Sequence, residues 1–202
     1  MATYLMVSSE GLFGSALNVA AIYIFLFVLF GSVLSFIGAG EFFVDIASAA
    51  FGNIVGGPAQ AAVYSSMLLG MVNGSGAATV VTAGTFTIPL MKKTGFDKDT
   101  AGGIVATAAS GGQIMPPVMG AVAFLMADAT SIPYGTICLA ALIPAVLYYL
   151  TTSTGIISYA HRHNIPVIER GTDDPTAMQI LKKGWYFFTP IVLLIALMVM
   201  GI

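Results

Sequence analysis

Two short groups of glycine, proline and polar residues interrupt long apolar runs, and they are the residues of this chain best suited to bind a ligand. The first group is Asn-Gly-Ser-Gly at residues 73–76, and the second is Ser-Gly-Gly-Gln-Ile-Met-Pro-Pro at residues 110–117. Paired glycines and adjacent prolines do not continue a regular helix, because proline lacks the N–H and clashes with the preceding turn. Each group therefore predicts backbone whose peptide groups are not all used in helical hydrogen bonds.

Non-helical backbone at membrane depth is tolerated only where protein or a water-filled cavity surrounds it. Unwound carbonyl groups there can coordinate a cation such as Na⁺, and the N-termini of half-helices direct partial positive charge towards an anionic substrate. The side chains that would add oxygens and donors are Asn73, Ser75, Thr79, Ser110 and Gln113. All of these except Ser110 are expected to contact the substrate.

Each interruption also has a simpler interpretation. Gly70 and Gly74 form a small-xxx-small pair, which in membranes often means only that two helices pack closely. The pair Pro116-Pro117 taken alone is more often a kink than a binding site. The combination of a hairpin tip with a broken helix, each polar and each midway along its span, favours a shared site.

The elements that position these groups must lie in lipid. The chain is 57% hydrophobic and only 8% charged, whereas soluble domains average about a quarter charged. Four stretches contain no lysine, arginine, aspartate or glutamate, namely residues 11–40, 46–91, 100–127 and 129–161. Each exceeds the ~18 residues that indicate a bilayer-spanning helix.

We therefore expect an all-α integral membrane fold. Its elements are a spanning helix at 18–39, an interfacial helix at 41–52, a re-entrant helical hairpin at 58–91, a broken helix at 99–127, a spanning helix at 134–160, a polar loop at 161–184 and the start of a further helix at 185–202. A re-entrant hairpin is preferred to two full spans because its arms, roughly 21 and 26 Å, fall short of the ~30 Å hydrocarbon core. The last helix stops at residue 202 before completing a span, which indicates a piece of a longer polypeptide.

The basic residues return to one side of this arrangement. The chain contains seven of them, Lys92, Lys93, Lys98, Arg162, Arg170, Lys182 and Lys183. The positive-inside rule makes this side cytoplasmic and puts the loop at Asp128 outside. With the hairpin, the N-terminus of the chain also faces outward.

Several classes of function are excluded by the same sequence. Cys138 is the only cysteine, so neither a disulfide framework nor a cysteine-rich metal site is expected. The net charge of −2 provides no basic surface for nucleic acid. The spans contain no Ser-His-Asp spacing, phosphate loop or zinc motif, so an enzyme is not expected. A pore module whose hairpin lines a passive path is an alternative to a carrier.

Residues 73–95 and 108–127 resemble the corresponding segments of the DctM-type large membrane subunit of tripartite ATP-independent periplasmic (TRAP) transporters. Together with Gly-Glu-Phe-Phe-Val-Asp at residues 40–45, they are most similar to the fused-permease subgroup that works with TAXI-type binding proteins. The resemblance covers about residues 21–163, and its most specific element is Gly-Gln-Ile-Met-Pro-Pro at 112–117.

This resemblance implies half of an inverted-repeat, elevator-type carrier in the prokaryotic cytoplasmic (inner) membrane. The carrier would be driven by a sodium gradient, fed by a periplasmic binding protein, and specific for organic acids such as dicarboxylates, oxo acids, sialic acids or some amino acids. The residues expected at one of its paired sodium sites, mostly through backbone oxygens, are Gly74, Ser75, Gly76, Ser110, Gly111, Gly112, Gln113, Met115 and Pro116. Only one hairpin and one double-proline break are present, so the second repeat and the small-subunit helices are expected as partners for transport.

Overall fold

The structure is a computed structural model that describes residues 14–167 and 177–200. Every regular element within these two ranges is a helix, as the sequence predicts. Arg170, the segment 168–176 around it and the first residues of the chain lie outside the described ranges. The sides of the membrane expected for them stay predictions.

The first helical rod consists of three consecutive segments: α2 (Ser15–Val19), the π-helical η1 (Ala20–Ile24) and α3 (Phe25–Phe36). It coincides with the first expected span. After the rod, Gly38 adopts a φ of 99°, a left-handed conformation that glycine reaches without a steric penalty. The chain then turns into α4 (Ala39–Phe51), at the position of the expected interfacial helix.

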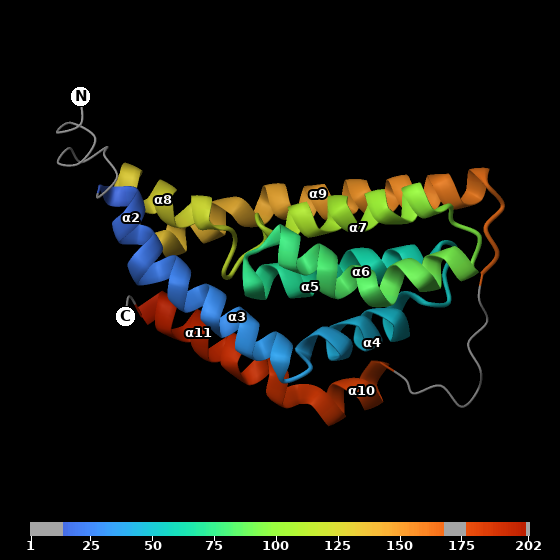
Figure 1. The fold of residues 1–202 in the computed structure, drawn as a ribbon, viewed down its shortest axis with the longest axis horizontal. Coiled ribbons are helices and arrows are strands. Elements are labelled where there is room, and N and C mark those ends of the chain that lie inside the picture. Colours follow the sequence, from blue (N-terminus) through green and yellow to red (C-terminus); the bar gives the residue numbers. More distant parts are fainter. Residues whose placement is uncertain (1–13, 168–176, 201–202) are drawn as a thin grey trace.

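Two antiparallel helices form a hairpin, α5 (Gly57–Asn73) and α6 (Gly76–Lys93), with only Gly74 and Ser75 between them (Figure 1). With 17 and 18 residues, the arms are about 26 and 27 Å long. The first arm is longer than expected because the helix continues through Asn73. The hairpin thus lies where the sequence predicts it, but its turn contains two residues, Gly74 and Ser75, and not the whole expected interruption at 73–76.

The expected broken helix consists of α7 (Lys98–Gly112) and α8 (Ala121–Thr130), separated by the non-helical residues 113–120. The two prolines of this segment provide no N–H for a helix. At the other end of α7, the Asp97 carboxylate caps the helix by accepting a hydrogen bond from the Thr100 N–H at 3.2 Å. Hydrogen bonding with Thr100 lowers the pKa of Asp97 below its usual value.

The longest helix is α9 (Tyr134–Arg162), whose 29 residues extend about 44 Å. After it come α10 (Ala177–Gly184), η2 (Trp185–Phe187) and α11 (Phe188–Met200). The segment expected as a loop at 161–184 therefore differs, because α9 runs into its start and α10 takes up its last eight residues.

Packing against α4 explains why α10 forms a helix within the segment that the sequence analysis expects to be a polar loop. Ile180 packs against the buried cluster that includes Phe42, and Gly184 lies so close to the Phe42 ring that a Cβ would overlap it. The rings of Phe42 and Phe187 stack with centroids 5.0 Å apart. Lys182 and Lys183 are exposed, and Lys183 lines the pocket between α10 and α4.

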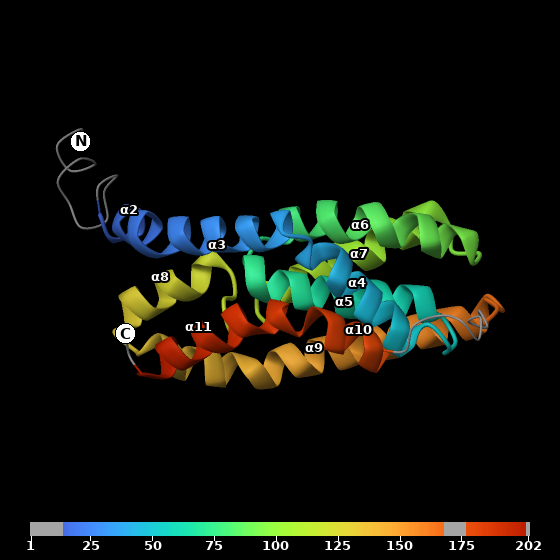
Figure 2. The same ribbon diagram turned by 90° about the horizontal axis from the view of Figure 1, so that it is seen from below.

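Helix α5 lies at the centre of the molecule, with thirteen of its 17 residues buried. One buried cluster joins it to α7 and α9: Ala59, Ala62, Val63, Met91, Phe96, Ala101, Val105, Ala108, Tyr149, Ile156, Ala160 and Ile165. A second joins it to α3, α4 and α11: Leu34, Ala39, Phe42, Phe43, Leu69, Val72, Ala83, Phe187 and Ile191. Figure 2 shows α5 between these neighbours. The first arm of the hairpin is thus enclosed by its neighbours, whereas α6 has an exposed face that includes Val81 and Phe86.

Two of the described helical stretches are long and apolar enough, by length and composition, to cross a membrane: Leu17–Phe36 and Tyr134–Arg162. A shorter apolar helix occupies Ala121–Thr130. Both long stretches expose large apolar side chains, among them Leu26, Leu29, Val33, Phe36, Leu139, Ile143, Leu147 and Leu150. Helices that are apolar on their exposed faces are suited to a lipid environment.

Candidate functional site

The hairpin tip is organised by its own side chains. Gly74 ends α5 with a φ of 63°, and the Ser75 hydroxyl accepts a hydrogen bond from the Ala78 N–H at 3.3 Å as the N-cap of α6. Asn73 Oδ1 accepts from the Ser75 N–H at 2.9 Å and from the Thr79 hydroxyl at 3.1 Å. These bonds hold three of the four predicted substrate residues, Asn73, Ser75 and Thr79, in one unit.

The amide nitrogen of Asn73 has no hydrogen-bond partner within the described part of the chain, although the side chain is only 8% exposed. The amide orientation is fixed by its neighbours, because the Ser75 N–H requires the oxygen on its own side. A buried donor without an acceptor costs about 1–3 kcal/mol. Asn73 Nδ2 is therefore a group that an acceptor on a ligand would satisfy.

The break between α7 and α8 is held to its neighbours at several points. The Val118 N–H donates to the Met71 carbonyl oxygen at 3.2 Å, which joins the break to α5. The Gly120 N–H donates to the Gln113 carbonyl oxygen at 2.7 Å, which closes the segment into a loop. From α9, the Tyr134 hydroxyl donates to the carbonyl oxygens of Pro117 and Val118. The break is thus a fixed structure and not a simple kink.

The hairpin tip and the break are in direct contact. A Cβ built on Gly74 would overlap the Met119 carbonyl oxygen, so this oxygen faces the tip. A Cβ on Gly76 would overlap Nε2 of Gln113, so the Gln113 side chain lies over the N-terminus of α6. Gly74 and Gly76 therefore allow the break to approach the hairpin tip. Gln113, the fourth predicted substrate residue, lies beside the tip.

The break lies beside the first third of α9, where Ile137, Ala140 and Ala141 line the same pocket as Met119. The end of α7 lies further along, at the middle of α9. Tyr148 is the central residue of this 29-residue helix, and its hydroxyl donates to the Thr107 carbonyl oxygen at 2.8 Å. The next residue, Tyr149, donates to the Ala108 carbonyl oxygen at 2.8 Å. Gly111 packs directly against both rings. In Figure 1 the hairpin lies beside α9, with its turn towards the N-terminal end of that helix.

Peptide groups around this contact remain without partners. Among the described residues, none donates a hydrogen bond to the carbonyl oxygens of Met115, Pro116 or Met119. At the start of α6, the N–H groups of Gly76 and Ala77 likewise have no acceptor within the described ranges. Carbonyl oxygens can coordinate a cation and helix N-termini attract anions, so both kinds of ligand group lie beside one another.

Other predicted site residues have structural roles. The Ser110 hydroxyl donates back to the Ala106 carbonyl oxygen at 2.9 Å within its own helix. Gly111 fits under two tyrosine rings, and Gly112 lies against Gly70, where a Cβ on either would approach the other's Cα to 2.7 Å. Close helix packing, the simpler interpretation given for Gly70 and Gly74, therefore applies to Gly70, and it coexists with the break.

Sequence reasoning did not single out Met119, Gly120 or Tyr134. Met119 follows the double proline by two residues and adopts a φ of 56°, so the bend continues past the prolines. Gly120, one residue later, was the available signal for this longer bend. Tyr134 begins a spanning helix, a position where tyrosine usually reflects the membrane interface.

An apolar pocket of about 520 Å³ opens beside the break. Ser110 and Gln113 are its polar side chains, and the remaining lining comes from the break, α8 and α9: Ile114, Met119, Gly120, Val122, Ala123, Met126, Ile137, Ala140 and Ala141. Such a pocket can hold hydrocarbon next to the polar groups of the site.

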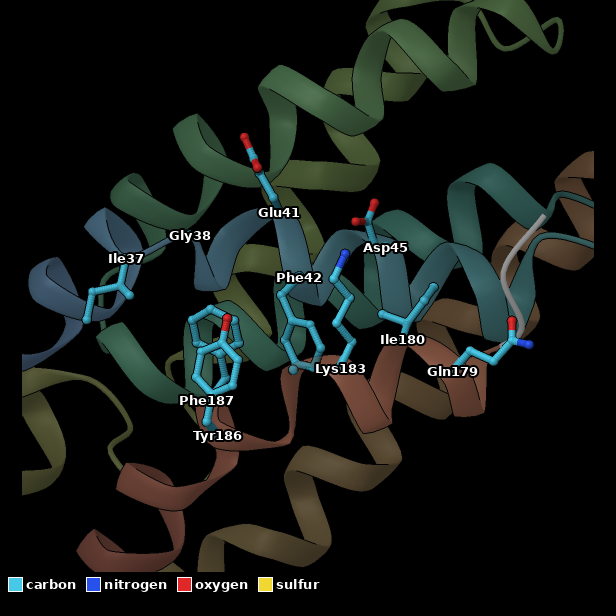
Figure 3. A pocket seen from close by; sticks show the side chains of 11 residues that line it. Ile37, Gly38, Glu41, Phe42, Asp45, Gln179, Ile180, Lys183, Tyr186 and Phe187 are labelled. Atoms are coloured by element: carbon cyan, nitrogen blue, oxygen red, sulfur yellow. The ribbon is translucent and has the colours of Figure 1, made fainter. Parts of the chain in front are cut away.

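A second pocket, of about 670 Å³, lies between α4 and α10 (Figure 3). Its charged side chains are Glu41 and Asp45 from α4 and Lys183 from α10. It also contains the stacked aromatic face of Phe42 and Phe187. This pocket is lined by residues 37–45 and 179–187, and none of the predicted site residues lines it.

Comparison with known proteins matches residues 2–202 to the family described as the DctM component of tripartite ATP-independent periplasmic transporters. The chain is 32% identical over 71% of its length to the C4-dicarboxylate TRAP transporter large permease protein DctM of Pseudomonas aeruginosa, covering 33% of that protein. It is 24% identical over 83% of its length to the sialic acid TRAP transporter permease protein SiaT of Haemophilus influenzae, covering 27% of it.

The chain spans about a third of the length of the curated relatives it matches first. The two relatives described above are both named as transporter permeases. The family match covers the hairpin, the break and both long apolar helices. The chain therefore belongs to the DctM family, the large membrane component of tripartite ATP-independent periplasmic transporters.

Proposed function

We propose that this chain forms an ion- and substrate-binding half of a sodium-coupled secondary transporter that imports organic acids. The observation that supports it best is the contact of two helix interruptions, with peptide groups that lack partners among the described residues, beside the first third of α9. If α9 crosses the bilayer, this contact lies within the membrane and the hairpin is re-entrant. Non-helical backbone at that depth is retained where it binds a ligand or lines a cavity.

The proposed sodium site uses neutral oxygens. The carbonyl groups of Met115, Pro116 and Met119 lack donors within the described residues, and Met119 faces the hairpin tip at Gly74. The Ser75 hydroxyl adds a side-chain oxygen at the same tip. Hard cations favour such oxygen ligands, and a cation here would also offset the loss of water around the carbonyls.

The proposed substrate contact is with an anionic group at the start of α6. The N–H groups of Gly76 and Ala77, which have no acceptor among the residues that the structure describes, lie at the helix N-terminus, where the helix dipole favours negative charge. Asn73 Nδ2 and the Gln113 amide that lies over Gly76 add donors. A carboxylate is the organic anion that these donors would bind, and a bound Na⁺ beside it would raise its affinity, which is the basis of coupling.

The partners in this proposal come from the family. A periplasmic binding protein of the TAXI type would deliver the organic acid, and the second repeat and the small-subunit helices would complete the carrier. The basic end of the molecule, with Lys98 and Arg162, would face the cytoplasm. In an elevator-type cycle the hairpin and the broken helix would move together, which the hydrogen bond from Val118 to Met71 and the close glycine contacts favour.

The decisive experiment is uptake into proteoliposomes by the full-length permease with its binding protein. We expect accumulation of a labelled organic acid only with an inward sodium gradient, and none when sodium is replaced by choline. Uptake that needs the binding protein but ignores the gradient would contradict sodium coupling. Passive flux without either component would favour the pore.

A further inference from the structure

Tyr134 connects α9 to the break through its hydroxyl group. Tyr134 Oη lies 3.2 Å from the Pro117 carbonyl oxygen and donates at short range to the Val118 carbonyl oxygen. One turn along α9, the thiol of Cys138 lies 3.7 Å from the same Pro117 oxygen. Tyr134 and Cys138, at the start of α9, thus supply the donors for the carbonyl groups of Pro117 and Val118.

The peptide between Pro117 and Val118 is consequently held from both sides. Its carbonyl oxygen is bound by Tyr134, and its N–H donates to Met71 on α5 at 3.2 Å. Because a peptide unit is planar and its two ends point in opposite directions, these two bonds fix its orientation. The next carbonyl but one belongs to Met119, which faces Gly74 at the hairpin tip.

The Tyr134 ring has little freedom to leave this position. It stacks on Phe124 of α8 with centroids 4.5 Å apart and an interplanar angle of 4°. Phe124 is buried and in turn contacts Phe27 of the first rod, with centroids 5.0 Å apart. Three helices therefore hold the hydroxyl against the break before any ligand binds.

We infer that Tyr134 is a positioning residue for the ion site, because its hydroxyl and Met71 together fix the peptide plane that lies between the carbonyl group of Pro116 and that of Met119, which faces the hairpin tip. The inference rests on the proposed function. Tyr134 engages the carbonyl groups of Pro117 and Val118, so among the described residues the ones left for the cation are those of Met115, Pro116 and Met119. Loss of the hydroxyl leaves the break free to rotate, and pre-organisation of the ion site is lost.

The test is sodium-dependent thermal stabilisation of the purified full-length permease, with choline chloride keeping the ionic strength constant. Ligand that binds only the folded protein raises its melting temperature, so the response reports affinity without any substrate. Tyr134→Phe should raise the half-saturating sodium concentration about tenfold, the size of one hydrogen bond. In proteoliposomes the same shift should appear with maximal uptake at saturating sodium unchanged.

Tyr149→Phe is the matched control. It removes a buried hydroxyl from the same helix that also donates to a backbone carbonyl oxygen, at 2.8 Å, but this acceptor is Ala108 inside α7. We expect it to lower thermal stability while leaving the half-saturating sodium concentration within about twofold. Equal sodium shifts in both variants would overturn the role of Tyr134.

The outcomes also separate this inference from the proposed function. A wild-type permease that sodium does not stabilise beyond choline would contradict sodium binding itself. If Tyr134→Phe does not fold, Phe124→Leu keeps the hydroxyl but removes the ring stacked on it. That variant should raise the half-saturating sodium concentration by a smaller factor, and an unchanged value would count against the positioning role.

Discussion

Gly70 of α5 and Gly112 of α7 touch through their backbones: a Cβ built on either residue would stand 2.7 Å from the Cα of the other. No side chain separates the two helices at this crossing. The contact brings the end of α7, and the break that follows it, against the last turn of α5 before the hairpin tip. Two glycines therefore determine how closely the two interruptions approach.

Replacing Gly112 by alanine should push α7 away from α5, because neither backbone can yield without moving its helix. We expect a loss of about 1–3 kcal/mol, as is usual for overpacking, and a lower melting temperature of the full-length permease. The matched control is Gly102→Ala on the same helix, where a Cβ would meet nothing within 4 Å. That variant should be neutral or slightly stabilising, since alanine favours helix. A similar loss in both variants would show that the crossing is not the cause.

Asn73→Asp tests whether the unpaired amide nitrogen of Asn73 binds the substrate. Aspartate keeps an oxygen for Ser75 and Thr79 but replaces the donor by an acceptor with negative charge. We expect the half-saturating substrate concentration in uptake to rise at least about tenfold, while sodium still stabilises the protein. Asn53→Asp, at an exposed asparagine before α5, is the control for added charge. Unchanged substrate affinity in Asn73→Asp would contradict the proposed contact.

Much of the helical arrangement could be predicted because its interruptions depend on local backbone chemistry. Glycine at 74 and 76 and the two prolines at 116 and 117 act on their own residues, whatever surrounds them. Helix α10 could not be predicted in the same way. Only four of its eight residues are apolar, and the helix depends on Ile180 and Gly184 meeting Phe42, more than a hundred residues earlier.

The candidate site was predictable in its residue types but not in its contacts. Asn73, Ser75 and Thr79 are close in sequence and their hydrogen bonds are local. The position of Gln113 over Gly76 depends on how two helices cross, and the donor from Tyr134 comes from a third helix. Such long-range contacts leave no periodic pattern in one sequence.

The contact of Gly76 with Gln113 can be measured by a double-mutant cycle. Gly76→Ala inserts a methyl group where Gln113 Nε2 lies and should displace this flexible side chain from the α6 N-terminus. Gln113→Ala removes the same amide directly. Both variants should weaken uptake to a similar degree, and the double variant should be no worse than either one. Additive losses would show that the two residues act independently.

The orientation of the chain can be tested at the two ends of the helices. Phe96 stacks on Tyr159 with ring centroids 5.8 Å apart, so the basic segment after α6 lies beside the end of α9. Asp128 lies at the other end, on α8. In a Cys138→Ser background, we expect a membrane-impermeant thiol reagent applied outside cells to label Asp128→Cys and not Lys98→Cys.

The hairpin tip adds the discriminating position in the same labelling experiment. If the tip lies at mid-membrane in a water-accessible site, Ser75→Cys should react more slowly than Asp128→Cys, and sodium with substrate should slow it further. Asp128 is exposed and Ser75 is partly exposed, and in Ser75→Cys a thiol of similar size replaces the hydroxyl that caps α6. Equal labelling of Ser75→Cys and Lys98→Cys from outside would contradict a re-entrant hairpin. In that case α5 and α6 would be two full crossings, and the unpaired peptide groups at the tip would lie in water, where they need no ion.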